Sequence, residues 1–106
     1  MKNAPQFLYM IRPTRLAMLA EGPTDQEAAI ITDHFEYLRM LTERNVVILA
    51  GRTLNSDETS FGVVILRAQD EATARAIMES DPAVRERVMQ ATLYPYRVAL
   101  IGGLEE

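Results

Sequence analysis

Apolar residues recur along this chain in two alternating patterns, and their order predicts the fold. Four short segments are rich in β-branched and aromatic residues, which is typical of strands: 6–11, 46–51, 61–68 and 91–101. Segments 24–44 and 70–80 have the character of helices. The predicted order is β-α-β-β-α-β, which is the ferredoxin-like arrangement of a four-stranded antiparallel sheet with two helices on one face.

The first predicted helix has recognisable ends and an apolar face. Thr24 and Glu27 form a capping-box pattern at its start, and the helix should end near Arg44 and Asn45. Its buried face is expected to contain the residues that follow three- and four-residue spacing: Ile31, His34, Phe35, Leu38 and Leu41.

The second predicted helix is capped by Asp70 and is followed at once by another helix start. Its core-facing side is expected to include Ala72, Ala76, Ile77 and Ser80, on or near one side. Asp81 then stands in an N-cap position before Pro82, and proline is well tolerated at a first helical position because its missing N–H has no partner there. The connection 12–23, between the first strand and the first helix, is long and is expected to contain one helical turn around 16–19.

The two middle strands predict how the sheet is buried. Segments 46–51 and 61–68 are almost continuously apolar, so both of their faces require burial, whereas helices in this chain order cover one face only. The sequence therefore predicts a homodimer formed through the uncovered sheet face.

Length, composition and net charge limit the classes of protein to which this chain can belong. The 106 residues suit one domain over 1–106, and the net charge of −4 argues against nucleic-acid binding. No segment is long and apolar enough to span a membrane, and no export signal is seen at the start, so a cytoplasmic location is expected. The absence of cysteine excludes disulfides and cysteine-based zinc sites.

Candidate chemistry centres on His34, the single histidine of the chain. The standard nucleotide-binding, metalloprotease and serine-hydrolase motifs are absent, and one histidine cannot supply a typical first-row metal site. His34 is then either a packed helix residue or a general acid or base. The second interpretation requires a partner that orients the ring.

Asp81 is the candidate partner, because the loop after the second helix can approach the first helix. Helix capping is the alternative role for Asp81, and the two roles are compatible because a carboxylate has several lone pairs. Arg52 and Arg12 are candidates for holding an anionic group, or else are simply solvated. Tyr94 and Tyr96 are interpreted as packing residues.

Several segments together resemble the YCII-related (YciI-like) domain family. They are FLYMIRP, GPTDQEAAIITDHFEYLRML, LAGRT, FGVVILRA and SDPAV, in that order. The resemblance covers about 7–100 and implies a dimeric α+β barrel, in which two ferredoxin-like protomers pack sheet against sheet. It also implies that His34 and Asp81 form an active-site dyad in a cleft. Relatives in the wider superfamily include muconolactone isomerases, cofactor-free monooxygenases and enzymes of aromatic degradation.

Three hypotheses follow from these observations. The first is an enzyme of lyase or isomerase type that uses no metal or organic cofactor, with His34 and Asp81 moving a proton on a small organic acid or aromatic-derived metabolite. The second is a domain that binds a small, anionic ligand or serves in a stress response without catalysis. The third is a purely structural dimer in which His34 is a core residue.

Overall fold

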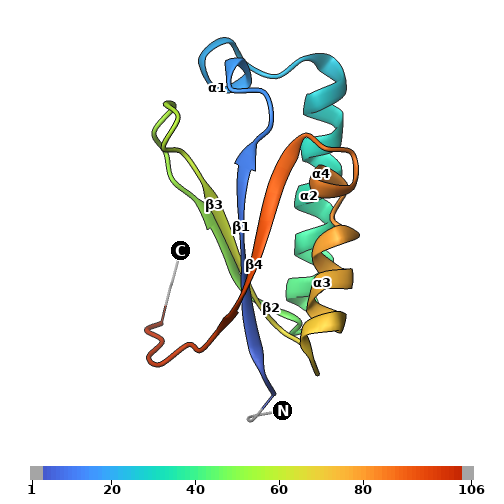
Figure 1. Cartoon of the computed structure of the whole chain (residues 1–106), viewed down its shortest axis with the longest axis vertical. Coiled ribbons are helices and arrows are strands. Elements are labelled where there is room, and N and C mark those ends of the chain that lie inside the picture. Colours follow the sequence, from blue (N-terminus) through green and yellow to red (C-terminus); the bar gives the residue numbers. More distant parts are fainter. Residues whose placement is uncertain (1–3, 104–106) are drawn as a thin grey trace.

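The computed structural model describes residues 4–103 and contains four strands and four helices (Figure 1). The strands are β1 (Gln6–Pro13), β2 (Val47–Arg52), β3 (Gly62–Arg67) and β4 (Met89–Tyr96). The helices are α1 (Ala17–Glu21), α2 (Asp25–Glu43), α3 (Glu71–Glu79) and α4 (Pro82–Arg85). The predicted β-α-β-β-α-β order is confirmed, with α1 as the helical turn in the long connection and α4 as a short helix directly after α3.

The strands form one antiparallel sheet in the order β2-β3-β1-β4, so β1 and β3 are central. β1 pairs with both β3 and β4 along its length, with Tyr9 opposite Val64 on one side and Leu93 on the other. The β2–β3 pairing contains an irregularity between Val47 and Leu49. This topology places the C-terminal end of β1 beside the start of β4, where Pro13 pairs with Met89.

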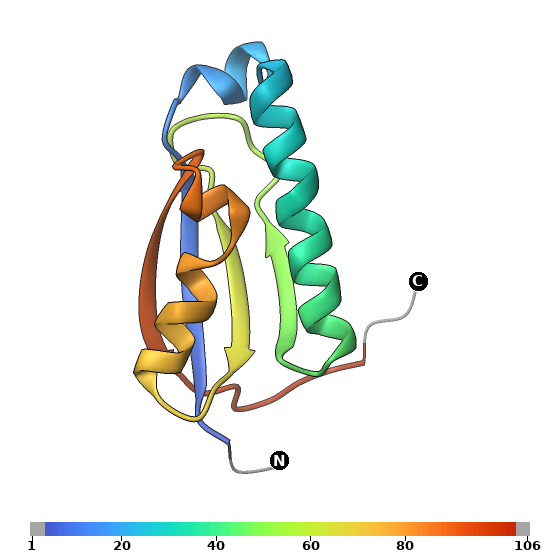
Figure 2. The same cartoon turned by 90° about the vertical axis from the view of Figure 1, so that its right-hand side faces the viewer.

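The two long helices cover one face of the sheet, where they lie side by side (Figure 2). The core between the layers contains alternate residues of β1, which are Phe7, Tyr9 and Ile11, and residues of both long helices. Burying these side chains supplies the main driving force for folding, at about 25 cal/mol per Å² of apolar surface.

The N-terminal end of α2 forms as its sequence predicts. The Thr24 side chain accepts a hydrogen bond from the Glu27 amide, the Glu27 side chain accepts one from the Thr24 amide, and the helix ends with Arg44 as C-cap. Leu38 and Leu41 are buried, but Phe35 is 62 % exposed, so its predicted place in the core is wrong. Tyr37 packs against the core instead, because the buried face of α2 is centred closer to Tyr37 than to Phe35.

The predicted inner side of the second helix is largely wrong as well. Ala74 and Met78 are the buried residues of α3, with Ile77 partly buried. Ala72, Ala76 and Ser80 are exposed. Ala74 and Met78 lie four positions apart and therefore share a helix face, which the several alanines in this segment obscure in the sequence.

The last strand also differs from its predicted range of 91–101. It begins at Met89, which pairs with Pro13, and ends at Tyr96, which pairs with Gln6. β1 begins at Gln6, and the amide of Val98 donates to the Gln6 side chain at 2.7 Å rather than to a strand partner. The chain beyond Tyr96 therefore leaves the sheet.

The face of the sheet opposite the helices carries no helix within the described chain (Figure 1). Its residues alternate with the core residues of β1 and include Leu8 and Met10, with Ile65 and Val63 beside them on β3. Leu49 is 42 % exposed and Tyr94 43 % exposed on the same face. None of the helices in residues 4–103 is long and apolar enough to cross a membrane.

Candidate active site

His34 and Asp81 meet between α2 and the start of α4, although 47 residues separate them in the sequence. The His34 Nδ1 atom lies 2.7 Å from Asp81 Oδ1 and 2.9 Å from Asp81 Oδ2. The aspartate side chain has no exposure to solvent, and the histidine side chain is 14 % exposed. These distances are those of a strong, charge-assisted hydrogen bond.

Asp81 occupies this position because it is also the N-cap of α4. Its Oδ1 atom accepts a hydrogen bond from the Ala83 amide at 3.0 Å, and Pro82 takes the first helical position. Helix capping and contact with His34 therefore occur together, and the cap fixes the carboxylate on a rigid helix end. The backbone of α4 in turn packs against α2.

Tyr9 supplies a third group to the same carboxylate. Its hydroxyl donates to Asp81 Oδ2 at 2.8 Å, and the Tyr9 side chain is fully buried in the core. Burial, followed by the negative charge of Asp81, raises the pKa of Tyr9 well above its ordinary value. Burial and the same charge also raise the pKa of Tyr37, whose hydroxyl donates to the Ile77 carbonyl at 2.7 Å.

These contacts determine which ring nitrogen of His34 can act. Both oxygens of Asp81 accept hydrogen bonds, one from Tyr9 and one from the Ala83 amide. An acceptor carboxylate requires that Nδ1 of His34 be the donor, so a neutral ring has its lone pair on Nε2. Within residues 4–103, Nε2 makes no hydrogen bond and is available to exchange a proton with a ligand.

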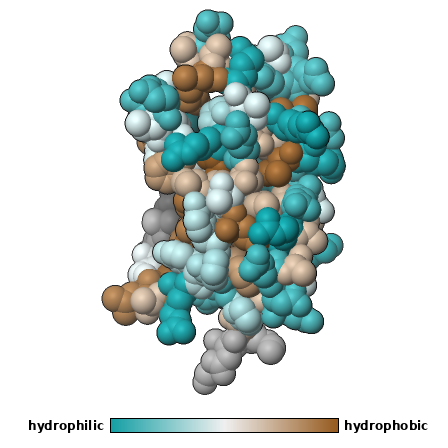
Figure 3. All heavy atoms as spheres, in the orientation of Figure 1, coloured by the Kyte–Doolittle hydropathy of each residue, from teal (hydrophilic) through white to brown (hydrophobic). Residues whose placement is uncertain are grey.

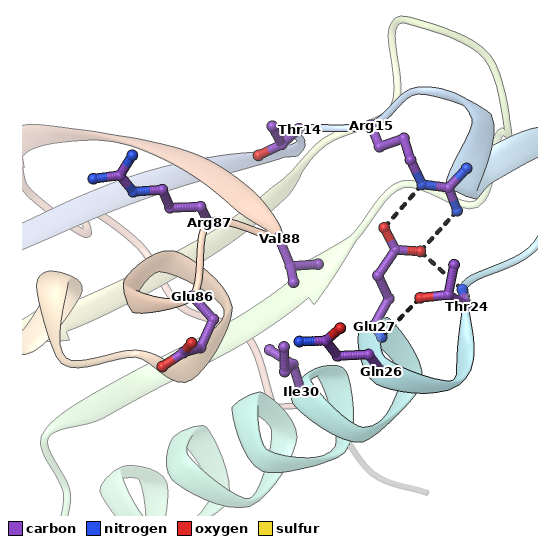
Figure 4. Close-up of a pocket in the computed structure, with 9 residues that line it drawn as sticks. All are labelled: Thr14, Arg15, Thr24, Gln26, Glu27, Ile30, Glu86, Arg87 and Val88. Carbon is purple, nitrogen blue, oxygen red and sulfur yellow. Dashed lines mark hydrogen bonds and ion pairs between the residues drawn. The ribbon is translucent and has the colours of Figure 1, made fainter.

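A pocket of about 260 Å³ lies at the start of α2, and the residues that line it do not include His34 or Asp81 (Figure 4). Its lining comes from the β1–α1 junction, the first turns of α2 and the turn between α4 and β4. Ile30 lines the pocket from α2 and precedes His34 by four residues, so the two share a helix face. Glu86 lines the pocket from the C-terminal end of α4, the helix that Asp81 caps.

An ion pair between Arg15 and Glu27 forms one wall of the pocket (Figure 4). The guanidinium binds the carboxylate with two hydrogen bonds, of 2.9 Å from Nε and 2.7 Å from Nη2. The Thr24 amide donates to the same carboxylate at 2.8 Å. These hydrogen bonds and the charge of Arg15 lower the pKa of Glu27 to about 2 and attach the β1–α1 connection to the start of α2.

The α4–β4 turn forms the opposite wall. Arg87 has a φ of 64°, in the left-handed region that non-glycine residues rarely adopt, and its amide donates to the Val84 carbonyl at 3.1 Å. This conformation reverses the chain directly after α4 and brings Val88 into the pocket lining. Ile30 and Val88 give the pocket an apolar surface among its polar residues.

A model of the YCII-related domain matches residues 6–95 of the chain. The chain belongs to the YCII-related family. A search of curated proteins finds no match. Among solved structures, the chain is similar to the 5-chloro-2-hydroxyhydroquinone dehydrochlorinase TftG of Burkholderia phenoliruptrix AC1100, in complex with 2,5-dihydroxybenzoquinone. The TM-score is 0.62 at 16 % identity, over 86 % of this chain and 93 % of that chain, which shows a shared fold.

The other predicted site residues of this YCII-related domain lie apart from the dyad. Arg12 alternates with the core residues of β1 and lies over the Phe61 ring, 5.6 Å from its centroid. Arg52 lines a second pocket of about 260 Å³ at the β2–β3 end of the sheet, together with Phe61. Neither arginine hydrogen-bonds to His34 or Asp81 among the residues described. Their role in holding an anion stays a prediction.

Two features of the site were not predicted from the sequence. Tyr9 lies on the core face of β1 together with Phe7 and Ile11. A buried tyrosine needs a hydrogen-bond partner, so this pattern could have indicated a polar contact of Tyr9 in the core. The pairing of Arg15 with Glu27 had no such signal, because it depends on the path of the 12–23 connection. Within 4–103, no group of three or more His, Cys, Asp or Glu side chains is placed to hold a metal ion.

The Arg15–Glu27 pair predicts a specific acid sensitivity. The pKa of Glu27 falls from 4.5 to about 2 on folding, so the folded carboxyl binds its proton less readily than the unfolded one. The stabilisation is complete above about pH 4.5 and is lost as the pH falls towards 2. Urea unfolding of the wild type and of Glu27→Gln should differ most above pH 4.5 and converge towards pH 2.

Glu58→Gln is the control for this measurement, because Glu58 is an exposed loop residue with no ion pair in the described part of the chain. Its unfolding free energy should stay within about 0.5 kcal/mol of the wild type at each pH. A constant difference between the wild type and Glu27→Gln across this pH range would contradict the assigned pair.

Proposed function

We propose that this YCII-related domain is an enzyme that uses His34 as a general acid or base and Asp81 to hold the imidazole. The observation that carries the proposal is the contact of Nδ1 with both carboxylate oxygens, at 2.7 and 2.9 Å, with Nε2 left without a partner in residues 4–103. An imidazole that is oriented by a buried carboxylate is the usual arrangement for proton transfer near neutral pH.

The pocket at the start of α2, which Ile30 lines one helical turn before His34, supports a small substrate. At about 260 Å³ it lies just below the range of pockets that take drug-sized ligands, so a molecule with a single ring is the appropriate size. Ile30 and Val88 offer apolar contact to a ring, and threonine, glutamine and charged side chains offer polar contacts to its substituents. A small organic acid or an aromatic-derived metabolite fits this description.

The structural neighbour supports the same reaction class. TftG is named as a dehydrochlorinase, and its structure contains 2,5-dihydroxybenzoquinone. Loss of HCl from an organic molecule requires a group that accepts a proton, and His34 Nε2 can be such a group here. We therefore favour a lyase or isomerase reaction that begins with proton removal from a carbon or oxygen acid, and that uses no cofactor.

A direct test compares His34→Gln and Asp81→Asn with the wild type, following the absorbance of single-ring hydroxyquinones and muconolactones. Loss of proton transfer should lower kcat/KM by about 10²- to 10⁴-fold in His34→Gln. Asp81→Asn should also be impaired, because an amide cannot hold the same tautomer. Asp33→Asn makes the same chemical change on the exposed surface of α2 and should leave turnover unchanged.

The result that contradicts this assignment is turnover that survives in His34→Gln. Binding of 2,5-dihydroxybenzoquinone without turnover of any compound, with an affinity that falls in His34→Gln, would support a ligand-binding domain instead. Loss of stability as the one effect of His34→Gln would support a structural role.

We also propose that two copies associate through the open sheet face. Leu8, Met10, Leu49 and Val63 lie there without a covering helix in the described chain. Isolated apolar residues on a surface are ordinary, but a continuous apolar sheet face is typical of an interface. The segment after β4 lies beside this face, as an exposed hydrophobic group at the lower left of Figure 3, and contains Leu100 and Ile101.

The mass in solution tests this association. Light scattering at micromolar concentration should give twice the 11.9 kDa of one chain. Leu49→Glu should shift the mass towards one chain, because it introduces a charge at the proposed contact. Ala72→Glu, on the exposed side of α3, should leave the dimer intact. A wild-type mass of one chain would contradict the interface.

A further inference from the structure

Tyr9 contacts the dyad from the core of the sheet and has no place in the proton transfer proposed above. Its hydroxyl donates to Asp81 Oδ2 at 2.8 Å, across 72 residues of sequence, and neither side chain is exposed. The residues that share its face of β1, Phe7 and Ile11, are entirely apolar. A phenylalanine would fill the same space, so the hydroxyl is the feature that requires an explanation.

The proton arrangement of the dyad depends on whether Asp81 can carry a proton. With Asp81 as a carboxylate, Nδ1 donates to it and Nε2 has the lone pair. With Asp81 protonated, its O–H can donate to Nδ1, and the ring proton then belongs on Nε2, which can no longer act as a base. Each hydrogen bond that Asp81 accepts stabilises its charged form, and two donors besides His34 supply such bonds: the Ala83 amide at Oδ1 and the Tyr9 hydroxyl at Oδ2.

We infer that Tyr9 is a positioning residue whose hydroxyl, by occupying Asp81 Oδ2, keeps Asp81 an acceptor and holds the proton of His34 on Nδ1. This inference rests on the proposed function for its catalytic meaning, but the arrangement itself is a property of the free protein. No solvent reaches Oδ2 to replace a missing donor, since Asp81 is completely buried. A hydrogen bond to a charged group is also stronger than one between neutral groups.

The raised pKa of Tyr9 is consistent with this role. Burial and the charge of Asp81 raise the pKa of Tyr9 above its ordinary value, so the O–H is available to donate at neutral pH. Tyr9 is a fixed donor because it belongs to a central strand that is paired on both sides.

The test uses ¹⁵N NMR of the imidazole, which reports one residue because the chain has a single histidine. In the free wild-type protein at mildly alkaline pH, Nδ1 should carry the proton and Nε2 should show the signal of an unprotonated nitrogen. In Tyr9→Phe the ratio of the Nδ1–H form to the Nε2–H form should fall by about tenfold or more, the effect of one lost hydrogen bond to a charged group.

Tyr37→Phe is the matched control. It removes a hydroxyl that is also engaged in the core, but that hydroxyl donates to the Ile77 carbonyl rather than to Asp81. Both variants should lose stability in thermal unfolding, and Tyr9→Phe alone should change the tautomer ratio. Equal ratios in the wild type and Tyr9→Phe, or equal changes in both variants, would overturn the inference.

A measurement on the wild type covers the case in which Tyr9→Phe does not fold. The buried Tyr9 hydroxyl proton should exchange slowly enough to be observed, with a cross-peak to the His34 Nδ1 proton, and its absence would overturn the inference. None of these measurements needs a substrate. If Tyr9→Phe changes the tautomer ratio but the protein shows no turnover that depends on His34, the proposed function alone is refuted. If turnover depends on His34 but Tyr9→Phe leaves the ratio unchanged, the role of Tyr9 alone is refuted.

Discussion

Burial of the Asp81 carboxylate is the constraint on which the rest of the site depends. An isolated buried carboxylate is costly, so its oxygens must be satisfied by donors that the fold itself provides. Here the donors come from a central strand, a long helix and a helix end: Tyr9 of β1, His34 of α2 and the Ala83 amide of α4. One side chain therefore connects the sheet to both parts of the helical layer.

The same constraint determines which ring nitrogen of His34 can react. A carboxylate that can only accept hydrogen bonds requires His34 to donate from Nδ1, which leaves Nε2 as the reactive nitrogen. The pocket of about 260 Å³ lies one helical turn along α2 from that ring. Its walls are fixed by the Arg15–Glu27 pair and by the reversed backbone at Arg87. The proposed reaction requires that a ligand held in this pocket reach the free nitrogen of the preorganised base.

Local patterns in the sequence predicted the elements well, and they predicted contacts between elements only in part. The capping box at Thr24 and the Asp81-Pro82 start of α4 both formed as expected, because capping depends on residues close in sequence. The His34–Asp81 contact was anticipated from chain order and family resemblance. Phe35 was misplaced because three- and four-residue spacing alone does not define the exact centre of a helix face.

Contacts that depend on the path of a loop could not be predicted from the sequence. The approach of Arg15 to Glu27 requires the 12–23 connection to turn back over the start of α2. Arg12 is separated from the dyad because alternate β1 residues occupy opposite faces, and Arg52 because it ends the edge strand β2. The last strand was predicted too long because its end is set by its partner β1, which begins at Gln6.

The most direct test of the central claim is a crystal structure of this protein soaked with 2,5-dihydroxybenzoquinone. We expect the ring in the pocket between α2 and the α4–β4 turn, with one of its atoms within about 3.2 Å of His34 Nε2. The Asp81 contact to Nδ1 should remain in place. A ligand bound with its ring elsewhere, or a His34 ring whose Nε2 faces away from an occupied pocket, would contradict the account.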